Sequence, residues 1–148
     1  MKFLPIIFSA VISLFSQSVN AGIDDKNFGT LKVSSISSIY DGDTFRAVIK
    51  DVHPLLGERI GIRVSGVDTP EIRGKCKLEK SLAKKAKKFT VNFLRSSKKI
   101  ELRNVTRGKY FRIVADVYGD GRNLTKLLIR SGHAVKYDGG KKSKDWCK

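Results

Sequence analysis

The sequence predicts an α+β fold in which a small five-stranded β-barrel carries two or three packed helices. Two observations lead to this prediction. Apolar and polar residues alternate through several short segments, which is the two-residue period of a half-buried strand. Between these segments lies one long basic stretch whose apolar residues recur every three or four positions, as on one face of a helix. A second, shorter helical pattern follows the last strand.

Three segments with strand periodicity come first, at residues 31–40, 44–52 and 58–67. In the middle segment Phe45, Ala47 and Ile49 alternate with more polar neighbours, so that one face is apolar. Pro54 and Gly57 indicate a turn before the third segment. Together these features predict a meander of three antiparallel strands.

The helical pattern begins at Leu78 and continues through Leu82, Ala86, Phe89 and Phe93, with lysines on the other face. Two strand-like segments follow, at residues 98–105 and 111–119, and then a short helix at residues 124–132 that Gly132 closes. The resulting order, three strands, a helix, two strands and a helix, suits an OB-fold-like barrel.

The first 21 residues have the pattern of an export signal. Lys2 precedes an apolar run, and Val19 and Ala21 are the small residues that a signal peptidase site requires. The run is shorter than the roughly 20 residues of a membrane span, which disfavours the alternative of an uncleaved anchor. We therefore expect a periplasmic or secreted protein in which residues 22–148 form a single domain.

The chain contains two cysteines, Cys76 and Cys147. In an oxidising compartment, two cysteines without further metal-ligand spacing favour one disulfide over a zinc site. This bridge would join the end of the chain to its middle.

Charge is the strongest compositional feature, because 30 Lys and Arg against 14 Asp and Glu give a net charge of +16. Such a charge favours a polyanionic partner: nucleic acid, an anionic membrane surface or an acidic polysaccharide. The lysines at residues 84–88 resemble a membrane-binding face. Because the barrel needs the opposite face of that helix, a solvated basic face is the better interpretation.

Four of the few acids lie in two tight clusters, Asp41 and Asp43 in DGDT and Asp68 and Glu71 in DTPE. Carboxylates that meet beside backbone carbonyls bind hard divalent cations. The competing interpretation is that both clusters are turns, and for either cluster alone it would be preferred. A three-strand meander can bring the two clusters together, which favours a cation site on a polyanion-binding surface.

The segments DGDT (41–44), IRVSGVDTPE (62–71) and GKYFR (108–112) resemble the signature segments of the staphylococcal nuclease (thermonuclease) family in order and spacing. KKIEL (98–102) and LLIRSGHA (127–134) extend the resemblance. It covers roughly residues 31–137, nearly all of the mature chain, and implies an enzyme that hydrolyses phosphodiester bonds in DNA and RNA in a Ca²⁺-dependent reaction.

The resemblance also implies a role for each matching residue. It assigns Ca²⁺ binding to Asp43, Asp68 and the carbonyl of Thr69, and the role of general base to Glu71. It assigns contacts with the scissile phosphate to Arg63 and Arg112, and contacts with a further phosphate to Lys109 and Tyr110. These residue types suit the chemistry, because guanidinium forks and a metal stabilise charge that develops on phosphate oxygens.

Three features depart from the family pattern or compete with it. Phe111 stands where the family usually has glycine. Residues 139–148 read GGKKSKDWCK where the family commonly has a long charged helix. His53 and His133 permit a metal-free acid–base mechanism, although neither lies near other candidate residues in sequence. The alternative to a nuclease is a non-catalytic nucleic-acid-binding module, and in either case we expect a monomer.

Overall fold

The structure, a computed structural model, describes residues 27–148. The predicted export signal at residues 1–21 lies outside the described residues. The elements in chain order are β1 (Leu31–Ile39), β2 (Thr44–Ile49), α1 (Pro54–Gly57), β3 (Ile60–Val64), β4 (Val67–Asp68), α2 (Lys77–Ser96), β5 (Ile100–Arg107), β6 (Arg112–Gly119), β7 (Arg122–Asn123), α3 (Leu124–Arg130) and β8 (Val135–Lys136).

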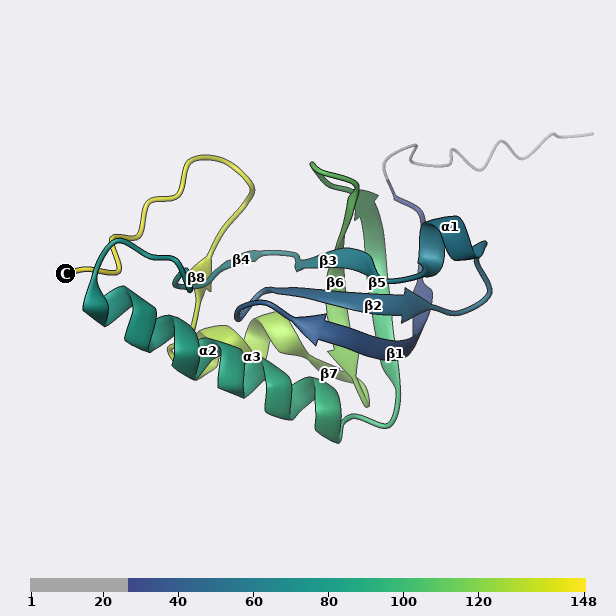
Figure 1. The fold of residues 1–148 in the computed structure, drawn as a ribbon, viewed down its shortest axis with the longest axis horizontal. Helices are drawn as coiled ribbons and strands as arrows, with labels where there is room; N and C mark the ends of the chain where they lie inside the picture. The colour runs from purple at the N-terminus through teal and green to yellow at the C-terminus, as the bar shows by residue number, and fades with distance from the viewer. Residues whose placement is uncertain (1–26) are drawn as a thin grey trace, which may run out of the picture.

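Five strands close into a barrel in the order β3-β2-β1-β5-β6, and the parallel pairing of β3 with β6 closes it (Figure 1). The other neighbouring strands of the barrel pair antiparallel. The predicted meander is therefore present as β1, β2 and β3. The prediction of an α+β, OB-fold-like barrel with two or three helices is confirmed, with α1, α2 and α3 as the helices.

Two local features differ from the sequence prediction. Residues 54–57, expected as a turn, form the single helical turn α1, which the Nδ1 atom of His53 caps by accepting the Leu55 N–H at 3.2 Å. The predicted strand 58–67 is divided at Gly66, where φ is +76°. The chain thus leaves the barrel after β3 and forms β4, which pairs with β8 in a separate two-stranded sheet. Neither short strand has enough residues to show a two-residue period.

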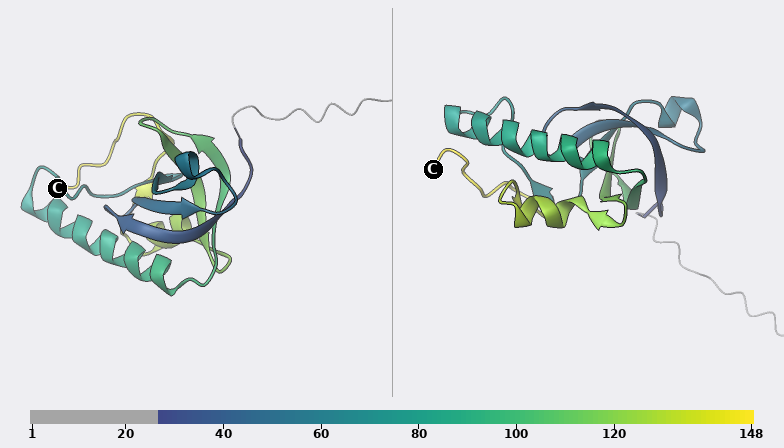
Figure 2. Two further views of the ribbon diagram at one scale, coloured as in Figure 1. Left: turned by 45° about the vertical axis from the view of Figure 1, so that its right-hand side comes forward. Right: turned by 90° about the horizontal axis from the view of Figure 1, so that it is seen from below.

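Helix α2 lies along one side of the barrel, next to α3 (Figure 2). Of the predicted apolar face, Ala86 and Phe93 are buried, whereas Leu78 is 50% exposed. Ala83 and Thr90 complete the buried face at the same spacing of three or four. Small alanines let the helix approach the barrel closely, while the lysines of the opposite face lie toward solvent. Among residues 27–148, no helix has the length and apolar character needed to cross a membrane.

Alternating burial along the strands defines the barrel interior. On β3, Ile62 and Val64 are fully buried, whereas Arg63 between them lies on the outer face. On β6, Ala115 and Val117 point inward in the same way. This alternation leaves the outer faces of β3 and β6 free for polar side chains, and those faces belong to adjacent strands.

The C-terminal segment is held to the domain at both of its ends. After β8 the Tyr137 N–H donates to the Gly66 carbonyl oxygen at 3.1 Å, and further on Cys147 forms the predicted disulfide with Cys76 at the start of α2. Residues 137–147, here called the C-terminal strap, arch from β8 back to the N-terminal end of α2 (Figure 1). The disulfide thus bends the strap over the loop that precedes α2 and contains Glu71.

Candidate active site

Asp43 is the most buried acid of the candidate site, with an exposed fraction of 0%. It follows β1 and immediately precedes β2, and the Asp41 carboxylate accepts its backbone N–H at 3.1 Å. One carboxylate oxygen of Asp43 accepts the Thr69 N–H at 3.0 Å and the Thr69 hydroxyl at 2.9 Å. These bonds join the DGDT and DTPE segments, which the predicted three-strand meander was expected to bring together.

The turn that carries Asp43 is fixed against α2. The hydroxyl of Thr90, which is fully buried, donates to the Gly42 carbonyl oxygen at 2.6 Å. A Cβ atom on Gly42 would lie 2.9 Å from the Cβ of Ala86 and 2.8 Å from the Thr69 Cγ2. Only glycine therefore allows this turn to fit between the helix and the DTPE segment.

Arg63 connects the two aspartates from the outer face of β3. Its guanidinium forms an ion pair with Asp43 and lies 3.6 Å from the Asp68 Oδ1 atom. It also donates to the Val67 carbonyl oxygen at 3.2 Å. Because Asp68 is only 2% exposed, its charge needs a cationic neighbour. Arg63 thus holds the two buried carboxylates around one positive charge.

Glu71 lies at the rim of this cluster, with its side chain 43% exposed. Its carboxylate accepts a hydrogen bond from the Lys142 ammonium at 2.6 Å. The same ammonium lies 2.7 Å from the Asp68 Oδ1 atom, an ion pair that lacks the alignment of a hydrogen bond. The C-terminal strap therefore places a lysine on two of the acids that the resemblance assigns to cation binding and catalysis.

Glu79, in the first turn of α2, positions the loop that carries Glu71. Its carboxylate accepts the Lys75 N–H at 2.8 Å and the Glu71 N–H at 3.3 Å. Gly74 packs directly on the same carboxylate. In the sequence, Glu79 stands out only as an acid among the lysines of this helix. Helical periodicity does not distinguish it from an ordinary acid in a first helical turn.

The parallel pairing of β3 with β6 brings the second arginine to the site. Gly61 is opposite Arg112 and Arg63 is opposite Val114, so both arginines project from the same outer face. Arg112 lies against Gly61, where a Cβ would come within 2.9 Å of the Arg112 Cγ atom. Arg63, Glu71, Lys109 and Arg112 then line a single hollow of about 620 Å³.

Tyr110 does not line this hollow. It belongs to a neighbouring groove on the other side of Arg112, and it is 87% exposed. Tyr110 and Phe111 both have φ of +56°, a left-handed conformation that non-glycine residues seldom adopt. The loop therefore retains, at Phe111, the conformation for which glycine is favoured, and it turns the two aromatic side chains away from the acids.

The charged groups perturb one another in two places. Burial, together with the nearby Asp43 charge, raises the pKa of Asp41 to about 7. Partial burial alone would lower the pKa of Lys142, but its close interactions with the Asp68 and Glu71 carboxylates outweigh that effect and raise the pKa to about 12. The strap lysine is therefore a permanent cation at any physiological pH.

The donor set fits a hard divalent cation. Asp43 and Asp68 offer buried carboxylate oxygens, and the adjacent Thr69 offers a backbone carbonyl. Hard cations such as Ca²⁺ prefer oxygen ligands of this kind. The geometry around Asp68 supports the fit, since its Oδ1 atom already draws two cationic side chains without forming a hydrogen bond with either.

A cluster of Cys76, Glu79 and Cys147 is the one group of three potential metal ligands that converges within the described residues. Both sulfur atoms are committed to the disulfide, and the Glu79 carboxylate accepts two backbone N–H groups. A metal would require thiolates, which the disulfide removes. This cluster is therefore structural.

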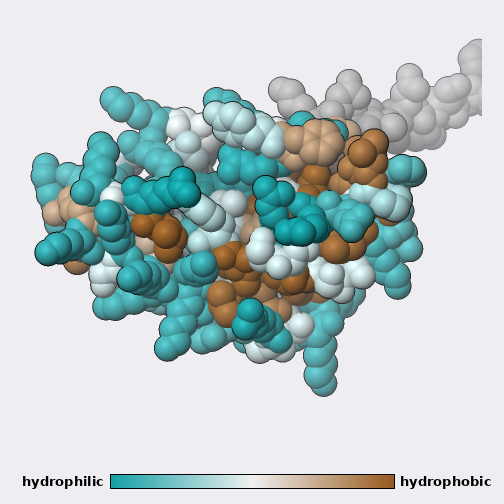
Figure 3. Space-filling view, in the orientation of Figure 1, coloured by the Kyte–Doolittle hydropathy of each residue, from teal (hydrophilic) through white to brown (hydrophobic). Residues whose placement is uncertain are grey.

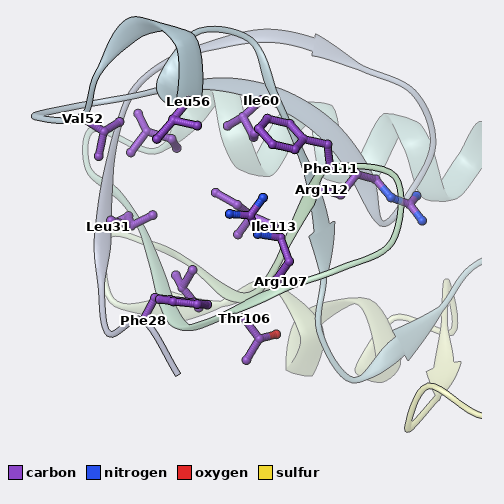
Figure 4. Close-up of a pocket in the computed structure, with 12 residues that line it drawn as sticks. Phe28, Leu31, Val52, Leu56, Ile60, Thr106, Arg107, Phe111, Arg112 and Ile113 are labelled. Atoms are coloured by element: carbon purple, nitrogen blue, oxygen red, sulfur yellow. The ribbon is translucent and has the colours of Figure 1, made fainter. Parts of the chain in front are cut away.

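The apolar pocket at the other end of β2 and β3 does not carry the chemistry (Figure 4). It has a volume of about 150 Å³, and its lining includes Phe28, Leu31, Leu56 and Phe111 but no acid. The two histidines do not belong to the candidate active site either. His53 caps α1, and His133 packs its ring on Phe89 with 5.1 Å between centroids.

Comparison with known families agrees with this geometry. A model described as staphylococcal nuclease homologue matches residues 61–146, more than half of the chain. The chain belongs to the staphylococcal nuclease family. Members of this family are generally nucleases that act on phosphodiester bonds. The match includes Arg63, Asp68, Glu71 and Arg112, whereas Asp43 lies before it and joins the site through the fold.

Three contributors to this nuclease-family site escaped the sequence analysis: Thr90, Glu79 and Lys142. Thr90 occupies an ordinary apolar-face position of the helix, and Lys142 is one of many lysines. No local pattern distinguishes either from its neighbours. Their partners lie far away in sequence, so only the folded chain identifies them.

Proposed function

We propose that this protein is an exported, Ca²⁺-dependent nuclease that hydrolyses phosphodiester bonds in DNA and RNA. The observation that carries the proposal is the joining of Asp43 and Asp68 around Arg63, beside Glu71, in a chain of the staphylococcal nuclease family. Oxygen ligands, a carboxylate at the rim and a guanidinium within one site are the groups that phosphodiester hydrolysis requires.

Asp43, Asp68 and the Thr69 carbonyl would hold Ca²⁺, which when bound supplies positive charge that polarises the phosphate and acidifies water. Glu71 accepts the proton of the attacking water as general base. Its half-exposed position on the rim of the hollow suits contact with solvent and substrate.

Arg63 and Arg112 donate hydrogen bonds to the phosphate oxygens on which charge accumulates. Both face the hollow from adjacent strands, and planar guanidinium groups match phosphate oxygens better than lysine does. Lys109 lines the same hollow and contributes positive charge to a flanking phosphate. Tyr110, exposed in the adjoining groove, contacts the same flanking phosphate through its hydroxyl.

The rest of the surface gathers the substrate without reading its sequence. Hydrophilic side chains cover most of the face seen in Figure 3, and apolar side chains gather near its centre and toward α1. With a net charge of +16, the protein attracts nucleic acid by counterion release, which weakens with salt. The disulfide and the export pattern support a periplasmic or secreted location, and we propose a monomer.

Cleavage assays on residues 22–148 test this function. Plasmid DNA and RNA are incubated with Ca²⁺ or with excess chelator, using the wild type and Glu71→Gln. We expect chelator to abolish cleavage, and Glu71→Gln to reduce its rate about 10²- to 10⁴-fold, because loss of a general base costs that much. Glu101→Gln, which changes an acid that pairs with Lys99 and Arg103 on β5, is the matched control.

Two outcomes would redirect the assignment. Cleavage that persists in chelator and in Glu71→Gln would contradict the metal-assisted mechanism and return attention to His53 and His133. Salt-sensitive binding of DNA without cleavage in any divalent cation would instead support the non-catalytic nucleic-acid-binding module.

A further inference from the structure

The Lys142 ammonium occupies the acidic face of the candidate cation site. It lies 2.7 Å from the Asp68 carboxylate and 2.6 Å from the Glu71 carboxylate. A divalent cation held by Asp68 would stand where this positive charge now neutralises the carboxylate. Two positive charges on one carboxylate repel each other, so the ammonium and a metal ion oppose each other at this site.

Lys142 belongs to a segment whose side chains make few contacts with the rest of the domain. In the part of the chain that the structure describes, Lys142 makes the only side-chain hydrogen bonds and ion pairs that join residues 138–146 to the rest of the domain. The other side-chain hydrogen bonds of residues 137–146 stay within the C-terminal segment, such as that of the Tyr137 hydroxyl to the Gly140 carbonyl oxygen at 2.6 Å. The strap is therefore held by its two ends and by this one lysine.

The ends of the strap keep the lysine near the acids. The β4–β8 pairing places Asp68 opposite Val135, close to the start of the strap, and the disulfide fixes its far end beside the loop that contains Glu71. Between them Gly139 has φ of +97° and open space around its Cα atom, so the strap can bend there at little cost. Tethering at both ends gives the ammonium a high effective concentration at the carboxylates.

Lys142 lines two neighbouring hollows. One hollow contains Arg63, Glu71 and Arg112, and the other contains Asp68, Thr69 and the end of the strap. The strap thus stands between the arginines that face the phosphate and the aspartate that faces the cation.

We propose that the C-terminal strap is a tethered inhibitor of cation binding, in which the Lys142 ammonium competes with Ca²⁺ for Asp68 and Glu71 and the Cys76–Cys147 disulfide keeps it in place. The inference rests on the proposed Ca²⁺ site and deepens it by naming the residue that sets its affinity. Binding of Ca²⁺ displaces Lys142 from the carboxylates. Reduction of the disulfide weakens the competition of Lys142 with Ca²⁺.

Calorimetric titration with CaCl₂, without substrate, tests the competition. Lys142→Gln keeps the length and polarity of the side chain and removes its charge. Since the ammonium must leave both carboxylates before a cation occupies them, we expect Lys142→Gln to bind Ca²⁺ roughly three- to tenfold more tightly than the wild type. Lys141→Gln, in the same segment but outside these ion pairs, should match the wild type.

Reduction of the disulfide gives a second arm. Dithiothreitol should raise the Ca²⁺ affinity of the wild type toward that of Lys142→Gln, and should change the affinity of Lys142→Gln itself by less than twofold. Asp68→Asn should lose Ca²⁺ binding in every background, which assigns the measured affinity to this site.

Acylation of lysines, followed by mass spectrometry, reads the position of the strap directly. Saturating Ca²⁺ should increase the labelling rate of Lys142 severalfold while leaving that of Lys141 unchanged. This readout requires no catalysis and no variant, so it also applies to a protein that binds nucleic acid without cleaving it.

The results separate this inference from the proposed function. Equal Ca²⁺ affinity in the wild type and Lys142→Gln, or Lys142 labelling that ignores Ca²⁺, overturns the strap proposal and leaves the nuclease intact. Tighter binding in Lys142→Gln without cleavage of DNA or RNA supports the strap and overturns the nuclease. Absence of Ca²⁺ binding in all variants, Lys142→Gln included, overturns both.

Discussion

Asp43 owes its position to hydrogen bonds rather than to its own segment. The Thr69 N–H and hydroxyl both donate to it, and the Asp41 carboxylate accepts its N–H. The residues of the DGDT turn thereby differ in what they contribute, since Gly42 permits close packing on α2, Asp43 faces Arg63, and Asp41 holds the backbone. Of these residues Asp41 has the raised pKa, which makes the stability of the protein depend on pH.

Asp41→Asn should stabilise the protein in a pH-dependent manner. The pKa of Asp41 is raised from an ordinary 3.8 to about 7, so between these values the native state holds a proton that the unfolded chain has lost. Wild-type stability therefore falls as pH rises through this window, by up to about 1.4 kcal/mol per pH unit. Asn keeps the acceptor oxygen and has no proton to lose, so its advantage should grow from pH 4 to pH 7 and then level off.

Urea unfolding in chelator at pH 4, 6 and 8 measures this difference. The exposed Asp51 supplies the control, because Asp51→Asn changes the same group in a solvated loop. An Asp41→Asn advantage that stays constant across the three pH values would show that Asp41 is ionised throughout.

At the scale of elements, α2 does more than cover the barrel. Its first turn contributes Glu79 to the loop of Glu71, and its middle contributes Thr90 to the turn of Asp43. The helix therefore sets the distance between the two acidic segments. The strands supply the other half of the arrangement, because the parallel β3–β6 register places Arg63 and Arg112 on one face.

Thr90→Val should test the helix contribution. Valine preserves the shape of the buried side chain but leaves the Gly42 carbonyl oxygen without its donor, which typically costs about 1–3 kcal/mol. We expect that loss in guanidinium unfolding, accompanied by weaker Ca²⁺ binding. Thr106→Val is a matched control on β5, because the Thr106 hydroxyl makes only a 3.4 Å contact with the Val114 carbonyl oxygen; equal losses in both variants would contradict the role of Thr90.

At the scale of the whole molecule, the disulfide joins residues separated by 71 positions. Closing a loop of that length restricts the unfolded chain and stabilises the native state by up to about 4 kcal/mol. Cys76→Ser with Cys147→Ser should therefore lower the unfolding free energy by several kcal/mol, measured in urea without Ca²⁺.

Reductant provides the internal control for this comparison. It should destabilise the wild type to the level of the double variant and leave the double variant unchanged. A wild type whose unfolding does not respond to complete reduction would mean that the bridge stabilises only the strap and not the domain.

Much of this architecture follows from the sequence alone. The two-residue period of β1, β2 and β3 and the lysine-backed apolar face of α2 determine local structure, because each depends on neighbours within a few positions. The two acidic clusters and the pair of cysteines likewise indicate their chemistry through composition and spacing. The short strands β4 and β8 escaped this reasoning, since two residues carry no period.

The tertiary structure alone decided which of these groups meet. Apart from the family resemblance, no local pattern around Arg112 indicates that it will share a face with Arg63. The barrel closes through β3 and β6 because that pairing satisfies their edges and buries Ile62 and Ala115. Lys142 is indistinguishable from the other lysines until the disulfide bends the strap onto Asp68 and Glu71. Local patterns are set by short-range sterics and solvation, whereas the choice of distant partners depends on packing the whole chain at once.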